Sequence, residues 1–281
     1  MRDIQLENAE GMSYLTSVAS GSVDLVLTDP PYIISRASGM NAHYDAVAAN
    51  AAAGVEFAKT EAEWEAHLAK SGLAGATEAQ RGNYLRHGSI YGTKYCVKTD
   101  YGEWDSAFTM EALEGFLREY FRALRKGGTA IVFFDLFKIS HLKEAMERCG
   151  FKQIRFVEWL KTNPQPLNSK LNYLTNCREI ALLGVKGGKP TFHSRYDKGV
   201  YEFPLQGGKT RFHPTQKSLS LIEALVEKHS NPGDVVLDTF AGSGTTAVAC
   251  LRTGRAFRGA EVSPEYFAKV LEVFPELFAH K

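Results

Sequence analysis

Short apolar runs alternate with amphipathic segments along most of the chain. Several runs are almost continuously apolar, which is typical of strands that are covered on both faces. The pattern predicts strands over 23–29, 129–135, 153–160, 178–185, 234–240 and 256–262. Segments with helical spacing lie between them and predict helices over 10–19, 109–126, 137–149, 217–229, 244–254 and 264–274. Alternating strands and helices indicate an α/β protein with a doubly wound, mostly parallel sheet.

Local stop and start signals set some of these boundaries. Lys126-Gly127-Gly128 is expected to end the helix 109–126, because glycine ends helices well. Ser263 is expected to cap the last helix, with Pro264 at its first position.

Two regions interrupt the alternation. Residues 33–108 contain no clear core strand, and a helix is expected at 61–70, so we interpret them as a largely helical insertion. Residues 186–216 are rich in Gly, Lys and Arg and are expected to form a long surface loop. The catalytic domain is therefore expected to comprise 1–32 and 109–281, and the insertion 33–108 and the basic loop 186–212 are candidate target-recognition elements.

Length and composition are those of a globular protein with one large domain. The chain has 281 residues, and no apolar run approaches the roughly 20 residues that a membrane span needs. The first ten residues lack the apolar stretch of a signal peptide. The four cysteines are widely spread without a CxxC pair, which suggests neither disulfides nor a metal site. We expect a cytoplasmic protein with reduced thiols.

The net charge of +1 hides an uneven distribution. Residues 151–220 contain twelve Lys/Arg and four Asp/Glu, a balance of +8. Residues 81–99 contain four basic residues, three tyrosines and no acid. Basic residues with interleaved aromatics suit a nucleic acid, although a solvated face balanced by acids elsewhere would also explain them.

The sequence TDPPY follows the apolar run SVDLVL. A residue before proline is extended, so Asp29 is expected at the tip of a buried strand. The two prolines stiffen the chain and have no N–H, which leaves carbonyls free to accept hydrogen bonds. Ligands bind at such strand tips in α/β sheets.

A second candidate site lies near the C-terminus, in DVVLDTFAGSGTTAVAC. Its glycines allow close approach of backbone N–H groups to a ligand at a helix N-terminus. Glu261 ends the next expected strand, where an acid typically holds ribose hydroxyls. The glycine spacing alone also fits a dinucleotide site. Only twenty residues follow Glu261, so the remaining strands must come from the N-terminal part, which indicates a circularly permuted order. This order is expected to place Asp29–Tyr32 across the switch point of the sheet from the glycine loop.

Several motifs together resemble one known family. The chain contains TDPPY, YGEWD (101–105), WLKTNPQP (159–166), HPTQKS (213–218) and FAGSGTT (240–246), in that order. This set is similar to that of the β-class DNA amino-methyltransferases, which carry DPPY first and FxGxG last. The resemblance implies a Rossmann-like methyltransferase fold, S-adenosylmethionine as cofactor and DNA as partner. Asn8-Ala9 stands where the family usually has Gly-Asp.

The resemblance also implies roles for particular residues. The expected catalytic residues are Asp29, Pro30, Pro31 and Tyr32. The expected cofactor-binding residues are Asp238, Phe240, Ala241, Gly242, Ser243, Gly244, Thr245, Glu261, His213 and Thr215. The expected DNA-binding residues are Arg81, Arg86, Lys94, Lys98, Lys161, Lys209 and Arg211. No metal is expected. Lys217 has two interpretations, as part of the HPTQKS motif or as a solvated residue of the first helical turn.

The target base is inferred from one letter of the motif. The family usually has Ser in place of Asp29 when it modifies cytosine N4, so the sequence favours adenine N6. The alternatives are a cytosine-N4 or RNA methyltransferase, a nicotinamide-dependent oxidoreductase and a non-catalytic DNA-binding relative. A homodimer and a restriction endonuclease partner are left open.

Overall fold

A computed structural model describes residues 3–33, 59–71, 75–88, 90, 108–164, 175–213 and 215–279, except for the side chain of Lys209. The chain forms two compact units, Met1–Tyr32 together with Phe108–Lys281, and Ile33–Ala107. In the described ranges, no helix is long and apolar enough to cross a membrane.

The larger unit is built on one eight-stranded sheet with the order β1-β8-β7-β2-β3-β5-β4-β6. Its strands are β1 (Ile4–Asn8), β2 (Val23–Thr28), β3 (Leu124–Phe134), β4 (Lys152–Lys161), β5 (Arg178–Val185), β6 (Val200–Phe203), β7 (Val235–Asp238) and β8 (Ala256–Glu261). The pairs β3–β5 and β5–β4 are antiparallel, and all other neighbours are parallel. The expected doubly wound, mostly parallel sheet with permuted strand order is therefore confirmed.

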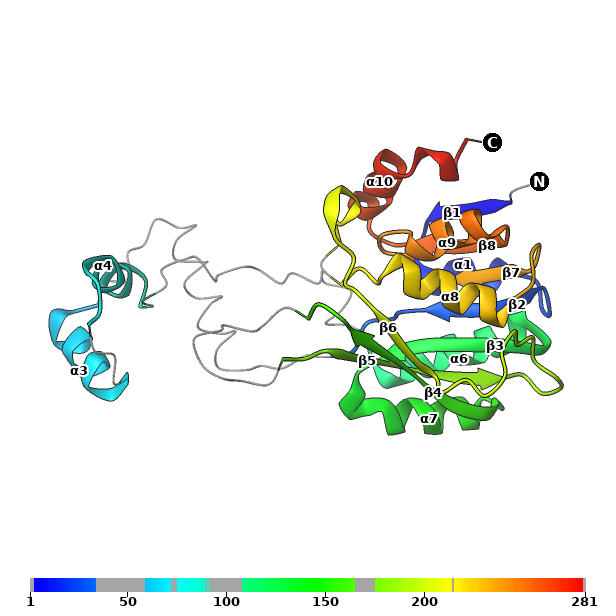
Figure 1. The fold of residues 1–281 in the computed structure, drawn as a ribbon, viewed down its shortest axis with the longest axis horizontal. Coiled ribbons are helices and arrows are strands. Elements are labelled where there is room, and N and C mark those ends of the chain that lie inside the picture. Colours follow the sequence, from blue (N-terminus) through cyan, green and yellow to red (C-terminus); the bar gives the residue numbers. More distant parts are fainter. Residues whose placement is uncertain are drawn as a thin grey trace. The chain divides into compact units, whose positions relative to one another are not determined.

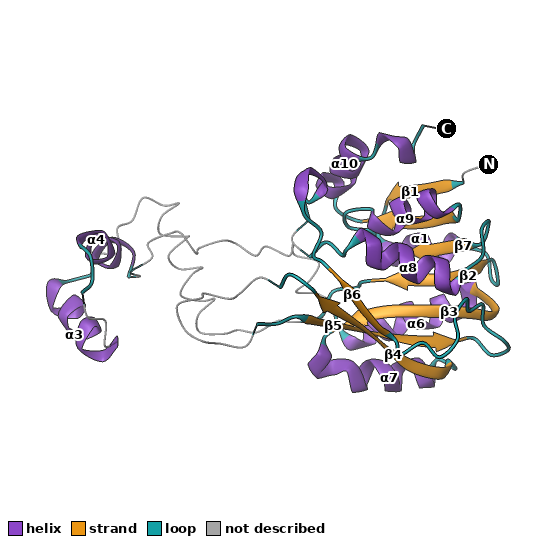
Figure 2. Cartoon of the chain, in the orientation of Figure 1, coloured by secondary structure: helices purple, strands orange, loops and turns teal. Residues whose placement is uncertain are grey.

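Helices lie on both faces of this sheet (Figure 2). Those of the larger unit are α1 (Gly11–Ser17), α6 (Met110–Ala123), α7 (Ile139–Arg148), α8 (Leu219–His229), α9 (Thr245–Thr253) and α10 (Pro264–Val273). Three short 3-10 turns complete it: η1 (Leu136–Lys138), η2 (Gly208–Thr210) and η3 (Pro275–Leu277). Helices α8 and α9 pack together on one face, while α6 contacts both α1 and α7 on the other (Figure 1).

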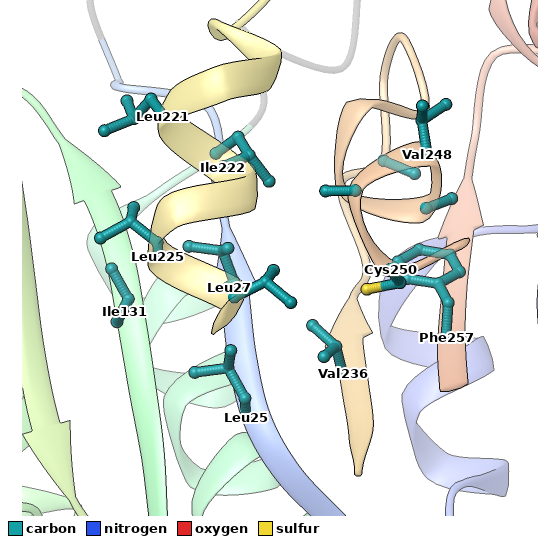
Figure 3. Packing of buried hydrophobic residues seen from close by; sticks show 14 of the residues in the cluster. Leu25, Leu27, Ile131, Leu221, Ile222, Leu225, Val236, Val248, Cys250 and Phe257 are labelled. Atoms are coloured by element: carbon teal, nitrogen blue, oxygen red, sulfur yellow. The ribbon is translucent and has the colours of Figure 1, made fainter. Parts of the chain in front are cut away.

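The main core lies between the sheet and the helices α8 and α9 (Figure 3). Leu25 and Leu27 of β2 point toward this layer, and Leu221 and Leu225 of α8 pack over them. Val26 between them is equally buried but lies outside this cluster, because successive strand residues point to opposite faces. Burial on both faces is the physical reason for the continuous apolar run in β2.

Two strands were missed, and two expectations about local structure were wrong. Strands β1 and β6 were not predicted, because each is a short edge strand with few buried residues. Consequently the loop expected at 186–216 is interrupted by β6 and η2.

Gly127 and Gly128 do not end a helix. Helix α6 ends at Ala123, and both glycines lie inside β3, where the pairing with β2 shifts register. Gly127 has φ +81°, and a Cβ on it would come within 2.5 Å of the Lys189 carbonyl oxygen. These glycines therefore allow a strand irregularity.

The described part of the smaller unit is a helical hairpin, whose first helix was expected at 61–70 and whose second helix was not predicted. Helix α3 (Glu61–Ser71) packs on α4 (Glu78–His87). Trp64 is buried against the ring of Tyr84, and the ring of His67 stacks on Tyr84 at 4.5 Å. Thr77 and Gln80 form a capping box that starts α4.

Candidate active site

The TDPPY segment and the glycine loop follow two neighbouring strands. Strands β2 and β7 are parallel and adjacent, with Val26 paired to Leu237, so their carboxyl ends meet at the same sheet edge. A buried hydrogen bond joins the two tips, from the Thr28 hydroxyl to the Asp238 carboxylate at 2.8 Å. The predicted juxtaposition of Asp29 with the glycine loop is therefore a property of the fold.

Asp29 is half-buried directly beyond β2, and Pro30 and Pro31 are buried. The Tyr32 hydroxyl donates to Asp29 Oδ1 at 2.8 Å. The ring of Tyr32 meets Phe134, at the end of β3, edge-on with 5.9 Å between the centroids. The motif thus places a carboxylate beside an aromatic ring in a fixed arrangement.

A lysine from a distant segment completes this cluster. The ammonium of Lys217 forms an ion pair with Asp29 Oδ2 and a second with Glu179 Oε2, at 2.9 Å. Glu179, on β5, also pairs with Lys161 of β4 at 2.7 Å. The four charges form a neutral chain, Asp29–Lys217–Glu179–Lys161, along the sheet edge.

Burial and charge act in opposite directions on these groups. Burial raises the pKa of Asp29 above its ordinary value, and Lys217 opposes this. Burial also raises the pKa of Glu179, but Lys217 and Lys161 outweigh it and leave that pKa lowered. Desolvation would lower the pKa of Lys217, yet Asp29 and Glu179 raise it well above its usual range. Lys217 is therefore a permanent cation at this site.

The glycine loop begins directly after β7. Gly242 has φ +50° and Gly244 has φ +72°, a region that favours glycine. A Cβ on Gly244 would come within 2.9 Å of Val270, so a larger residue would also clash there. Helix α9 starts immediately after Gly244, and the loop therefore presents the N-terminus of this helix to the sheet edge.

Two buried carboxylates hold this loop by its backbone. Glu261 accepts from Gly242 N and from Ser263 N, both at 2.7 Å. Asp238 accepts from Phe240 N at 3.1 Å and from the Thr246 hydroxyl at 2.7 Å. Asp238, which was expected to bind the cofactor, therefore bonds to the backbone of this loop.

Four other expected cofactor residues belong to this loop or to the start of α9. Ser243 and Thr245 are buried and bonded to each other through their hydroxyls at 2.8 Å. Ala241 is buried, and Phe240 packs on Phe116 with ring centroids 4.8 Å apart.

The HPTQKS motif contacts both halves of the site. His213 lies beside Gly242, where an added Cβ would come within 3.7 Å of the imidazole. Burial lowers the pKa of His213 to about 4, so this ring is neutral at pH 7. Thr215 is exposed, and its hydroxyl lies 3.2 Å from His213 Nδ1. Lys217, four residues after His213, reaches Asp29 and is buried, so the solvated interpretation was wrong.

Sequence reasoning missed Glu179 and the contact between Lys217 and Asp29. Glu179 is separated from any motif, and only the pairing of β5 with β4 brings it near Lys161. The HPTQKS motif was the signal that could have singled out Lys217. Its partner could not be read from it, because the two residues are 188 positions apart.

The expected DNA-binding residues are distributed over both units. Lys161 belongs to the charge chain, and Arg81 pairs with Glu61 and Glu78 within the helical hairpin. Arg86 and Arg211 are exposed. Lys209 lies in η2, with its side chain outside the described part, and Lys94 and Lys98 lie outside the described residues. The acid-free stretch 81–99 is thus partly neutralised by acids from elsewhere in the hairpin.

The donor set around the glycine loop fits an adenosine-type cofactor. Each oxygen of the Glu261 carboxylate accepts one backbone bond and has a second lone pair for a ribose hydroxyl. The N-terminus of α9 and the glycines with positive φ allow backbone N–H groups to approach a cofactor closely. Within the described residues, no group of three or more His, Cys, Asp or Glu could hold a metal ion.

The strand order, the glycine loop and the acid at the end of β8 define a Rossmann-like methyltransferase class. The sequence pattern of the family described as "DNA methylase" matches residues 23–272. The chain therefore belongs to this family of DNA amino-methyltransferases, whose cofactor is S-adenosylmethionine. This confirms the family, fold class, type of enzyme, cofactor and DNA partner expected from the sequence.

Individual relatives agree with this assignment. Type II methyltransferase M2.DpnII of Streptococcus pneumoniae is 33% identical over 189 residues, which cover 60% of this chain and 70% of the relative. Putative methylase YubD of Escherichia coli is 30% identical over 158 residues, 56% of this chain and 66% of the relative.

Solved structures share the fold. The M1.HpyAVI–SAM complex superimposes with a TM-score of 0.60 at 25% identity, covering 96% of this chain and 98% of that chain. The cytosine-N4-specific PvuII DNA methyltransferase gives a TM-score of 0.63 at 14% identity, covering 100% and 94%, which shows the fold alone.

Proposed function

We propose that this protein transfers a methyl group from S-adenosylmethionine to the N6 amine of an adenine in DNA. The observation that carries this proposal is Asp29, a carboxylate at the tip of β2 beside the glycine loop of β7. A carboxylate accepts a hydrogen bond from an amine that serine would bind less strongly. The preference for adenine N6 over cytosine N4 as the target rests on this residue.

The chemistry requires an amine that is poorly nucleophilic to become reactive. The N6 lone pair is conjugated with the adenine ring, and two acceptors on its two hydrogens free it. The Asp29 carboxylate supplies one acceptor, and the carbonyl of buried Pro30 supplies the second. Tyr32 offers its ring for stacking on the base, worth roughly 1–3 kcal/mol, comparable with the few kcal/mol that extrusion of a base costs.

The glycine loop holds the other reactant. When bound, S-adenosylmethionine supplies a methyl carbon on a positively charged sulfur. Transfer of this methyl group to the N6 amine would leave the neutral thioether on the cofactor and release one proton from N6. Glu261 is proposed to hold the ribose, and the backbone around Gly242 and Gly244 to approach the cofactor. Much of the rate enhancement in such a step comes from positioning.

The test is methyl transfer from labelled S-adenosylmethionine to unmethylated genomic DNA, followed by nucleoside analysis. We expect N6-methyladenine. N4-methylcytosine would overturn the choice of base, and no transfer to DNA, with transfer to RNA instead, would overturn the choice of substrate. Asp29→Ala should lose nearly all turnover and still bind S-adenosylhomocysteine. Near-normal turnover in a folded Asp29→Ala variant would contradict the proposed role of this residue.

The DNA-contacting elements are also a proposal. The insertion 33–108 follows Tyr32 directly in the sequence, so its first residue lies beside the proposed base site. Exposed Arg86 in α4 supports a phosphate contact by the insertion. Exposed Arg211 supports a second contact, in the loop 186–212.

We propose the cytoplasm as the location, because the substrate is genomic DNA and the described cysteines, Cys149, Cys177 and Cys250, are free thiols. A homodimer stays a prediction from the sequence, which sedimentation analysis tests directly.

A further inference from the structure

The environment of Lys217 brings together groups from several segments. Its ammonium forms ion pairs with Asp29 after β2 and with Glu179 of β5, and lies 3.4 Å from the Tyr32 hydroxyl. The same nitrogen lies 5.6 Å from the centroid of the Tyr32 ring and 5.1 Å from that of Phe133. The side chain of Lys217 is only 8% exposed. The ammonium is therefore largely removed from bulk solvent.

Fold stability alone does not explain this lysine. Removing an ammonium and two carboxylates from water costs several kcal/mol per ion, and buried ion pairs are often no more stable than apolar side chains of the same volume. The fold nevertheless places the ammonium of Lys217 in contact with one carboxylate oxygen of Asp29, and the other oxygen accepts a hydrogen bond from Tyr32. The cost is better explained by what the charge does to Asp29.

We propose that Lys217 is a positioning residue that keeps Asp29 ionised and turned toward the target amine, and that Glu179 holds Lys217 in place. This inference rests on the proposed function, in which Asp29 must accept a hydrogen bond from the amine. A protonated Asp29 would lose an acceptor site and gain a donor. The second lone pair of each Asp29 oxygen stays available to the amine.

Glu179 and Lys161 set the strength of this interaction. Glu179 divides the charge of Lys217 between two carboxylates, and Lys161 pairs with the far oxygen of Glu179. Removal of Lys217 takes away the cation that pairs with Asp29, while Glu179 keeps Lys161. Removal of the Glu179 charge leaves Asp29 as the one carboxylate of this cluster that pairs with Lys217. The two changes should shift the protonation of Asp29 in opposite directions. Among the described residues, the titratable groups that act on Asp29 are Lys217, Tyr32, Glu179 and Asp238, with Lys161 and Asp135 behind them.

The experiment compares Lys217→Met, Lys217→Arg and Glu179→Gln with the wild type. Lys228→Met is a matched control, because Lys228 likewise pairs with a carboxylate, that of Asp197, and lies over an aromatic ring, that of Tyr201. Lys228 stands near the C-terminal end of α8, roughly 14 Å along the helix axis from Leu219 at its start. Two quantities are measured: the single-turnover methylation rate against pH, and the titration of the Asp29 carboxyl by carbon-detected NMR, assigned with Asp29→Asn.

For Lys217→Met, the pH at which the rate rises and the pH at which Asp29 titrates should both increase by about one unit or more. For Glu179→Gln, both should decrease. Lys217→Arg should stay nearer to the wild type than Lys217→Met. Affinity for S-adenosylhomocysteine should change less than twofold, or about 0.4 kcal/mol, in Lys217→Met and Glu179→Gln. Lys228→Met should leave the profile unchanged.

Equal titration of Asp29 in the wild type, Lys217→Met and Glu179→Gln would overturn the proposal. If Lys217→Met does not fold, as judged by circular dichroism, the direction of the Glu179→Gln shift decides alone. A purely structural role would lower rates without opposite shifts. If the wild type transfers no methyl group to DNA, the proposed function fails, while the NMR titration still decides whether Lys217 controls Asp29.

Discussion

Replacement of Asp238 by asparagine should raise the free energy of unfolding, relative to that of the wild type, more near neutral pH than in acid. Asp238 is 4% exposed, and its carboxylate accepts hydrogen bonds from Thr28, Phe240 N and Thr246. Burial raises its pKa from the ordinary 3.8 to about 6, and these three bonds only partly oppose this. The ionised carboxylate is therefore less favourable in the folded protein than in the unfolded chain.

The sign and size of the effect follow from linkage. Because the folded pKa is raised, the stability contributed by Asp238 is fully present below the unfolded value and is lost as pH rises through about 6. A shift of about two units corresponds to about 3 kcal/mol at 1.36 kcal/mol per unit. Asparagine does not ionise. Its oxygen can still accept from Thr28 and Phe240 N, and its amide can donate to the Thr246 hydroxyl.

The assay is urea unfolding of both proteins at several pH values from 4 to 7.5. The difference in unfolding free energy, Asp238→Asn minus wild type, should rise by about 2.4 kcal/mol over this range, because about 0.5 kcal/mol of the effect is already present at pH 4. Other titrating groups occur in both proteins and cancel in the difference. A flat difference would refute the reasoning.

A control with the opposite sign is available at Asp197. Burial raises the pKa of that carboxyl, but bonds from Lys228 and Gly199 N outweigh burial and lower it. Its contribution is therefore present above the unfolded pKa of 3.8 and is lost only as pH falls below that value. With the urea series extended to pH 2, Asp197→Asn should lower stability at pH 7 more than at pH 2.

Two further predictions concern the ligands. Glu261→Ala removes the acceptor of Gly242 N and Ser263 N, and should raise the dissociation constant of S-adenosylhomocysteine at least tenfold, or about 1.4 kcal/mol, by calorimetry; unchanged affinity would mean that the cofactor pocket lies elsewhere. Arg86→Ala should lower the slope of log affinity for DNA against log salt by roughly one, with Arg81→Ala lowering it less because Glu61 and Glu78 already pair with Arg81; equal slopes in all three proteins would argue against a DNA contact by the hairpin.

Much of the candidate site was predictable because its two halves are local motifs. Asp29 and the glycine loop each follow a buried strand directly, and adjacent strand tips were implied by the permuted order. The role of Glu261 was only partly predictable. Its carboxylate holds the backbone of Gly242, a contact across nineteen positions that depends on the pairing of β7 with β8.

The errors in the predicted fold share one cause. Strands β1 and β6 lie at the two sheet edges, where few side chains are buried and the hydrophobic pattern is weak. Gly127 and Gly128 resemble a helix stop, yet they lie in a strand irregularity held by backbone bonds with Lys186. Partners distant in sequence decide both cases, because backbone pairing stabilises strands that their own residues specify poorly.

The sequence by itself determined the central strands, the helices between them and the identity of the family. These features depend on periodicity and on short motifs, which are local properties of the chain. Only the tertiary structure decided that Lys217 meets Asp29 across 188 positions and that Glu179 and Lys161 continue the line of charge. The physical reason is that a buried charge is stable only beside its partners, and the fold, not the local sequence, selects which residues these are.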